Sequence, residues 1–192
     1  MPLPPEESVI LFFTWIWALS EVIGSHIIPR LRQRGKDLMR ADRGSLFVIW
    51  FSIFASIFII VYFGTNEIAP LPEFFFGFGL ALMIFGIIFR QYSIWILGRF
   101  FSVRVRIASR HHIVQDGPYK YLRHPSYTGA LLIFIGLGLA SRTWLGTLLI
   151  VAVFFLVYGY RMNVEEAALR KNFGRKYDEY IRRTNRLIPY VY

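Results

Sequence analysis

The sequence predicts an all-α integral membrane protein with five transmembrane helices, of which the fourth and fifth form a hairpin, and a cytoplasmic C-terminal amphipathic helix. Three observations predict this class. Hydrophobic residues make up 55% of the 192 residues and the mean hydropathy is +0.45, which leaves too little polar surface for a soluble domain. Four stretches are long and apolar enough to enter a bilayer. The basic residues gather in segments that would lie on one side of it.

Three of the apolar stretches are expected to be single spans, and they cover residues 8–28, 45–63 and 74–97. Glu6 and Glu7 precede the first stretch, where a secretory signal would carry basic residues, so this stretch is expected to remain as a span. Glycines in the third and fourth stretches are expected to let helices pack closely. These glycines are Gly77, Gly79, Gly86, Gly136 and Gly138.

The fourth stretch, residues 127–160, is too long for one span of about 20 residues. It is interrupted at residues 140–144, so we expect a tight hairpin of two helices, the first of them short. Beyond it, residues 167–183 have apolar side chains at helical spacing with a break near Gly174, which predicts the amphipathic helix. No repeat or linker divides the chain, so residues 1–192 are expected to form a single membrane domain.

The charges predict the orientation in the membrane. All of the 22 Lys and Arg residues except Arg142 fall in residues 30–43, in residues 90–123 or after residue 160. Arg142 would share the opposite side with four acidic residues, Glu6, Glu7, Glu67 and Glu73. The positive-inside bias then places the N-terminus outside and the C-terminus in the cytoplasm. Anionic lipid headgroups account for the net charge of +10, so no nucleic-acid partner is expected.

The chemistry is expected between the two longer cytoplasmic segments, residues 98–125 and 161–192, because the outer loops are short. The absence of cysteine excludes disulfides, thiol nucleophiles and cysteine-ligated metals. His111 and His112 are adjacent and would point to different faces, so no metal site is expected. Residues 103–107 alternate in polarity and suit a short extended stretch, whose arginines would face either a ligand or lipid phosphates.

The run Arg123-His124-Pro125-Ser126-Tyr127-Thr128-Gly129 predicts a helix start that could bind an anion. Pro125 favours an extended His124 and the first turn of a helix. The free N–H groups of such a turn suit a carboxylate or phosphate, and His124 and Tyr127 can add hydrogen bonds. The alternative is an interfacial helix start in which Tyr127 is an anchor and Arg123 extends toward the headgroups.

Arg161 and Glu165 are four residues apart just after the last apolar stretch, so they would share one helix face. One interpretation is a common ion pair of little energetic value. The other is a functional pair, because charges near the membrane boundary are costly unless they are paired or used.

In order along the chain, the turn Gly117-Pro118-Tyr119, the run from Arg123 to Gly129, the hydrophobic hairpin, Glu165-Glu166 and the tail from Phe173 to Tyr180 resemble the isoprenylcysteine carboxyl methyltransferase family and its phospholipid methyltransferase relatives. The resemblance covers residues 103–189, which would be the cofactor-binding half of the domain. It implies an S-adenosylmethionine-dependent methyltransferase that releases S-adenosylhomocysteine and takes a lipophilic acceptor from the bilayer.

The resemblance also implies site residues. Those that would bind the cofactor are His111, His112, Ile113, Val114, Tyr119, His124, Pro125, Ser126, Tyr127 and Glu165. Arg161 would orient an acceptor carboxylate, and a further cofactor contact falls near Arg104, to which no role is given. Glu165 would bind the cofactor's amino group or offset its positive charge, while tyrosines would pack on adenine or over the sulfonium. A carboxylate acceptor needs no general base, whereas an amine acceptor would have only histidines or Glu166 for that role.

Three other functions stay open at this point. The acceptor could be a phospholipid amine. NADPH-dependent sterol reductases carry a similar motif, although they are longer and have more spans. A non-enzymatic lipid-binding or assembly protein would use the motif as an anchor only. Separately, Glu21 lies inside the first expected span, where it is either functional, protonated or paired with a neighbouring helix.

Overall fold

The computed structural model describes residues 5–27, 37–40, 45–101, 106–108 and 113–189. Its long helices are α1 (Pro5–Glu21), α3 (Ser45–Thr65), α4 (Phe74–Leu97), α5 (Pro125–Ala140) and α6 (Trp144–Phe173). The short elements are the π-helical η1 (Val22–Ile27), the 3-10 turns η2 (Gly98–Phe100) and η3 (Gly117–Lys120), the strands β1 (Asp37–Arg40) and β2 (Arg106–Ala108), and the helix α7 (Arg175–Arg183).

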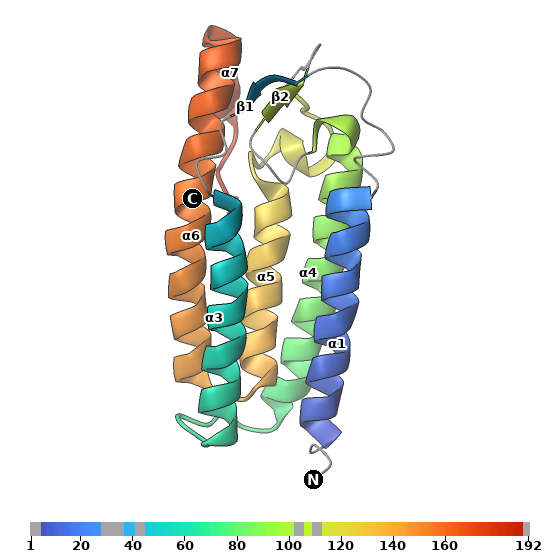
Figure 1. Ribbon diagram of the computed structural model, residues 1–192, viewed down its shortest axis with the longest axis vertical. Coiled ribbons are helices and arrows are strands. Elements are labelled where there is room, and N and C mark those ends of the chain that lie inside the picture. The colour runs from blue at the N-terminus through green and yellow to red at the C-terminus, as the bar shows by residue number, and fades with distance from the viewer. Residues whose placement is uncertain (1–4, 28–36, 41–44, 102–105, 109–112, 190–192) are drawn as a thin grey trace.

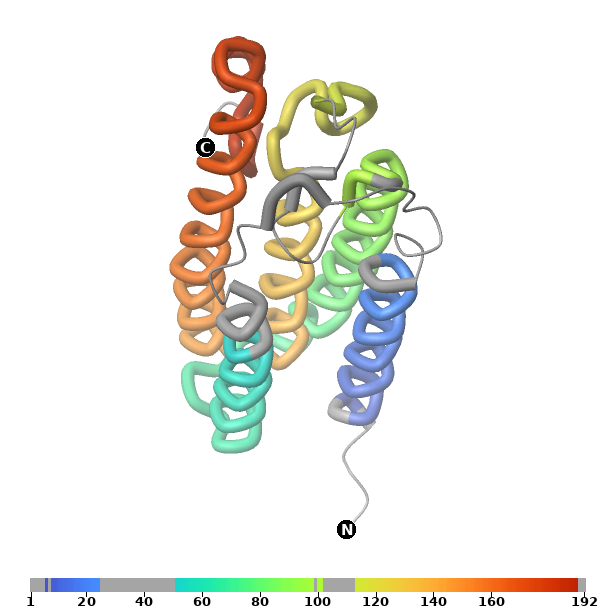
Figure 2. Tube along the Cα trace, turned by 45° about the horizontal axis from the view of Figure 1, so that its top comes forward, coloured from blue at the N-terminus to red at the C-terminus, as the bar shows by residue number. Residues whose placement is uncertain are grey.

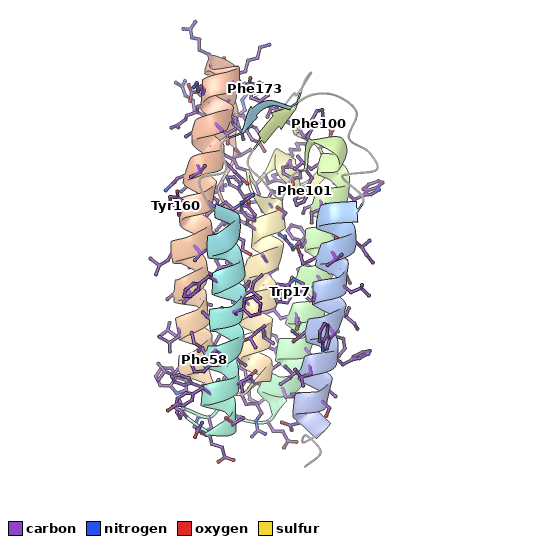
Figure 3. The ribbon with its side chains drawn as sticks, in the orientation of Figure 1. Trp17, Phe58, Phe100, Phe101, Tyr160 and Phe173 are labelled. Atoms are coloured by element: carbon purple, nitrogen blue, oxygen red, sulfur yellow. The ribbon has the colours of Figure 1, made fainter. Side chains whose placement is uncertain are left out.

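The long helices run side by side as a bundle in which α5 is the buried element (Figure 1). Trp17 of α1 points toward α5 (Figure 3) and meets the ring of Phe134 edge-on, with centroids 5.7 Å apart. Viewed with the top of the bundle tilted forward, α5 lies between α4 on one side and α6 on the other (Figure 2). The central position of α5 matters because its first turn carries the motif singled out in the sequence.

Helices α4 and α5 touch through their backbones, and glycines make this contact possible. A Cβ on Gly79 would lie 2.6 Å from the carbonyl oxygen of Gly136, and one on Gly86 would lie 2.8 Å from that of Gly129. Such distances are too short for any other residue, so the glycines set the separation of the two helices. Gly77 does not take part, contrary to expectation, because nothing lies within 4 Å of its Cβ position.

The predicted outer loops lie together at the end of the bundle that holds the N-terminus (Figure 1). The backbone N–H of Leu71 donates to Arg142 (2.8 Å), that of Trp144 donates to Ala69 (3.1 Å), and the Thr143 hydroxyl donates to Ile68 (2.8 Å). The hairpin between α5 and α6 therefore forms where the sequence breaks, and its turn is fixed by the loop before α4.

The outside of the bundle is apolar. Large hydrophobic side chains such as Phe58 and Tyr160 are exposed and project from it (Figure 3). Among the described residues, α4 and α6 are long and apolar enough to cross a membrane, and shorter apolar stretches occur at Ser8–Gly24, Phe51–Thr65 and Pro125–Ala140. Exposed aromatic and aliphatic surface of this extent suits contact with lipid rather than with water.

The fold departs from the prediction in two details. Helix α6 runs without interruption to Phe173, so residues 167–173 continue the last long helix and only α7, after Gly174 at φ +52°, is a separate segment. In addition, β1 and β2 form a two-stranded antiparallel sheet in which Met39 lies opposite Ile107. The expected extended stretch covered residues 103–107, and its first three residues lie outside the described part.

Candidate functional site

The start of α5 is held by the C-terminal segment. The backbone N–H of Arg123 donates to Asn185 (2.8 Å) and that of His124 donates to Arg186 (3.1 Å), beside a parallel bridge between Leu122 and Asn185. Leu187, which follows, is fully buried in the core. These bonds fix the extended backbone that Pro125 requires before a helix. The segment around Asn185 and Arg186 therefore holds the start of α5 in place.

A buried hydrogen-bonded group joins α5 to α6 at this point. The Tyr127 hydroxyl donates to Glu165 Oε1 (2.6 Å) and accepts from Arg161 Nε (2.7 Å). Arg161 Nε also lies 3.2 Å from Glu165 Oε1, and its side chain is only 2% exposed. Burying a guanidinium costs free energy, and here the carboxylate of Glu165 and the phenol of Tyr127 offset that cost. The Arg161–Glu165 pair therefore differs from an exposed ion pair on a helix surface, which contributes little.

His124 lies between two carboxylates. Its Nε2 is 3.1 Å from Glu166 Oε1, and its Nδ1 is 3.5 Å from Glu165 Oε2. Burial, the largest influence, opposes the charged ring, but the hydrogen bonds to both glutamates outweigh it and raise the pKa of His124 above its ordinary value. The ring also stacks on that of Tyr127, with centroids 5.4 Å apart.

Glu166, which the sequence suggested only as a base for an amine acceptor, is held by two arginines in addition to His124. It accepts from Arg123 Nε (3.0 Å) and from both Arg186 Nε and Arg186 Nη2 (3.1 Å each). Arg186 Nη2 also donates to the side chain of Asn163. The signal available in the sequence was the adjacency of Glu165 and Glu166, because consecutive helical residues point about 100° apart and can face two different groups.

The other expected cofactor residues fall into three sets. Tyr119, Pro125 and Ser126 are buried around the start of α5, and burial together with Tyr180 and Glu165 raises the pKa of Tyr119, which keeps its hydroxyl neutral. Ile113 and Val114 lie in the segment before η3, half-buried and buried, with no polar link to Glu165 among the contacts of the described residues. His111, His112 and Arg104 lie outside the described residues.

A depression of about 500 Å³ opens on the Glu166 side of this cluster. Its lining residues are Arg123, Asn163, Glu166, Arg170, Ile181, Thr184, Asn185 and Arg186. Within the described part of the chain, no three His, Cys, Asp or Glu side chains are grouped so that they could hold a metal ion. The ionisable side chains of the described site are carboxylates, arginines, phenols and the His124 imidazole.

Among the described residues, the donors to Glu165 leave one of its acceptor sites open. A carboxylate offers about four lone-pair sites, of which those facing Tyr127, Arg161 and His124 are occupied. Its side chain is still 20% exposed. A ligand ammonium can thus approach Glu165 without displacing a protein donor, which fits the amino group of the expected cofactor.

Comparison with known proteins finds the family that the motifs suggest. Residues 74–176 match the sequence model of the family described as phospholipid methyltransferase. Protein-S-isoprenylcysteine O-methyltransferase B of Arabidopsis thaliana is 33% identical over 117 residues, which are 60% of this chain and 59% of that protein. The corresponding protein of Schizosaccharomyces pombe is 35% identical over 81 residues, 42% of this chain and 34% of that one. An uncharacterized protein of Haemophilus influenzae is 31% identical over 98 residues, 50% of this chain and 57% of that one.

The fold is similar to that of a eukaryotic intramembrane Ras methyltransferase, an isoprenylcysteine carboxyl methyltransferase, with a TM-score of 0.63 and 23% identity. That match covers 74% of this chain and 52% of the other. Across these relatives the match spans from 34% to 59% of their length. The family model, by contrast, covers more than half of this chain and includes the start of α5 and both glutamates. The protein therefore belongs to the phospholipid methyltransferase family.

Proposed function

We propose that the protein is an integral membrane enzyme that transfers a methyl group from S-adenosylmethionine to a lipophilic acceptor, as an isoprenylcysteine carboxyl methyltransferase does. The observation that carries the proposal is Glu165, a carboxylate fixed by Tyr127, Arg161 and His124 yet still able to accept a ligand ammonium. Family membership supplies the reaction class.

The topology that goes with this function has five spans, formed by α1 with η1 and by α3, α4, α5 and α6. The outer end carries Glu6, Glu67, Glu73 and a single basic residue, Arg142, which pairs with Glu6 (3.5 Å). The remaining basic residues of the sequence lie in or after the opposite halves of the helices, in residues 30–43, in residues 90–123 and after residue 160, which supports a cytoplasmic C-terminus and active site. The whole chain is one domain, and residues 103–189 are its cofactor-binding half.

The side chains of Glu165, Tyr127 and Arg161 have direct roles in the proposed reaction. Bound S-adenosylmethionine supplies an electrophilic methyl group, and its displacement depends on alignment more than on proton transfer. Glu165 binds the amino group, and Tyr127 is oriented by its two hydrogen bonds to face the same volume. Arg161, anchored between Tyr127 and Glu165, orients the acceptor carboxylate by charge-assisted hydrogen bonds. Tyr119, Pro125 and Ser126, which are buried around the start of α5, supply further cofactor contacts.

The side chains around Glu166 favour a carboxylate acceptor over an amine. An ammonium must lose a proton before it can attack, so it needs a base. Glu166 is surrounded by donors from Arg123, Arg186 and His124, which stabilise its ionised form and make it a weak base. The raised pKa of His124 leaves that ring more protonated near neutral pH than an ordinary histidine. A carboxylate acceptor is already anionic and requires neither group.

A methyl-transfer assay tests the proposal and separates the acceptors. The protein is reconstituted in vesicles with phosphatidylethanolamine, with or without an S-prenylated cysteine, and supplied with S-adenosylmethionine labelled in its methyl group. Label that enters the prenylated acceptor and is released by alkali is a methyl ester, which is the expected result. Alkali-stable label in the phospholipid would move the function to amine methylation, and no transfer to either would refute the enzyme assignment for these acceptor classes.

Two variants accompany this assay. Glu165→Gln keeps the shape of the side chain but removes the charge that binds an ammonium, so transfer is expected to fall by about a hundredfold or more. Glu179→Gln makes the same change at an exposed position of α7 and is expected to leave transfer unaltered.

A further inference from the structure

Glu21, for which the sequence offered no role, is paired across the bundle. It is the last residue of α1, and its carboxylate accepts two hydrogen bonds from Arg90 of α4. One comes from Nε and the other from Nη2, the latter at 2.7 Å. Arg90 is buried, with 8% of its surface exposed. Both residues lie within expected spans, where an ionised side chain is costly unless it is paired or used.

The pair does not end at Glu21. Arg90 Nη1 donates to the backbone carbonyl of Ser126 (2.9 Å), in the first turn of α5. Ser126 lies between Pro125 and Tyr127, and Tyr127 carries the hydroxyl that orients Glu165 and Arg161. Arg90 thus connects α1 and α4 to the turn from which the proposed cofactor site is built.

The surrounding packing leaves little freedom to the two backbones at this point. A Cβ placed on Gly129 would lie 2.8 Å from the backbone nitrogen of Arg90, so α4 and α5 are in backbone contact one turn beyond Ser126. That contact sets the distance between α4 and α5. The hydrogen bond from Arg90 to Ser126 then limits how the first turn of α5 can rotate about its helix axis. Glu21 holds two of the guanidinium nitrogens and so directs the third toward this carbonyl.

From this geometry we infer that Glu21 and Arg90 are positioning residues for the proposed methyl-transfer site: the ion pair holds the first turn of α5 so that Tyr127 meets Glu165 and Arg161. The expected effect of the ion pair on cofactor binding rests on the proposed function, whereas its expected effect on the first turn of α5 does not. A buried ion pair is often no more stabilising than apolar side chains of the same size, so stability alone gives little reason for placing one here. The third hydrogen bond of Arg90, to Ser126, supplies a positioning role that apolar side chains could not fill.

A matched control lies one residue away. Gln91 Nε2 donates to the backbone carbonyl of Ser20 (3.1 Å) and to its hydroxyl (3.2 Å). This contact joins the same two helices beside the ion pair, and none of its bonds in the described structure reaches α5. Gln91→Ala therefore removes a polar contact between α1 and α4 without removing a contact to the site.

The test compares Glu21→Gln with Gln91→Ala in detergent-solubilised protein, by hydrogen–deuterium exchange of the amides in residues 126–130 and by titration with S-adenosylmethionine. Glu21→Gln is expected to speed exchange of these amides several-fold and to weaken cofactor binding by about tenfold or more. Gln91→Ala is expected to leave both the amide exchange and the cofactor affinity unchanged, even if it lowers the melting temperature as much as Glu21→Gln does. Glu21→Asp, which keeps the charge but withdraws the carboxylate by one methylene, is expected to be intermediate, and it decides the matter if the glutamine variant does not fold.

Unchanged exchange and unchanged affinity in Glu21→Asp and in any folded Glu21→Gln would overturn the inference, as would equal effects of Gln91→Ala. Failure of the proposed function has a different signature. In that case the unaltered protein does not bind S-adenosylmethionine at all, while the faster exchange of residues 126–130 in the Glu21 variants persists.

Discussion

Removing the guanidinium of Arg186 tests whether the C-terminal segment is part of the site. Arg186 binds Glu166 through two nitrogens, both at 3.1 Å, and the side chains are 16% and 12% exposed. Arg170 offers a matched comparison on the rim of the same depression, because it pairs with Asp178 at 3.2 Å while the two side chains are 57% and 50% exposed. The two arginines thus make the same kind of contact in very different surroundings.

The magnitudes follow from burial. Breaking a fully buried pair costs about 3–5 kcal/mol. Glu166 keeps Arg123 and His124 as partners in the Arg186→Ala variant, so we expect a loss of about 2 kcal/mol in the free energy of unfolding. An exposed pair contributes about 0–1 kcal/mol, so Arg170→Ala should lose less than about 0.5 kcal/mol.

Thermal unfolding in detergent measures the difference. For a chain of this size, about 2 kcal/mol corresponds to a fall of roughly 4–8 °C in Tm, whereas Arg170→Ala should shift Tm by no more than about 2 °C. Equal shifts in the two variants would refute the reasoning, because the contact of the C-terminal segment with Glu166 would then count for no more than a surface ion pair.

Three further predictions concern the site and the packing. Tyr127→Phe should lower the free energy of unfolding by about 1.5–3 kcal/mol, the value of one hydrogen bond to a charged group, because both bonds of the hydroxyl are lost while Arg161 and Glu165 still pair with each other. It should also weaken binding in a titration with S-adenosylmethionine. Gly79→Leu should abolish recovery of folded protein in size-exclusion chromatography, since its Cβ would meet α5, whereas Gly77→Leu should elute as the unaltered protein does. The raised pKa of His124 means that its contribution to stability is complete below its ordinary pKa of about 6.5 and is lost as the pH rises through the higher folded value, so Tm should fall over that range and should do so less in His124→Gln.

Much of the fold could be predicted from the sequence because the bilayer imposes helix lengths that hydropathy detects. The third span, α4 (Phe74–Leu97), has the predicted bounds, and the hairpin turns at the predicted residues. The continuation of α6 to Phe173 was missed because the apolar stretch ends at the expected membrane boundary, whereas the backbone hydrogen bonding of the helix continues beyond it. The pairing of β1 with β2 joins distant segments, which local periodicity does not reveal.

The site could be predicted in part. The family assignment from the ordered motifs is confirmed by the family model, and the spacing of Arg161 and Glu165 predicted their shared helix face. The partners of Glu166 could not be predicted, because Arg186 reaches it only after the chain has passed through α7 and turned back along residues 121–124. Pairing with a neighbouring helix was one of the alternatives for Glu21, but its partner Arg90 could not be predicted, since 69 residues separate them and only the packing of α1 on α4 brings them together.

The central claim is that this membrane bundle holds S-adenosylmethionine at Glu165, and calorimetric titration of the detergent-solubilised protein tests it most directly. The protein is titrated in parallel with S-adenosylmethionine and with NADPH, and both titrations are repeated on Glu165→Ala. We predict that the unaltered protein binds S-adenosylmethionine and not NADPH, and that the variant, still folded, binds neither. Binding of NADPH alone would assign the site to a reductase instead, and binding of neither by the unaltered protein would contradict the claim.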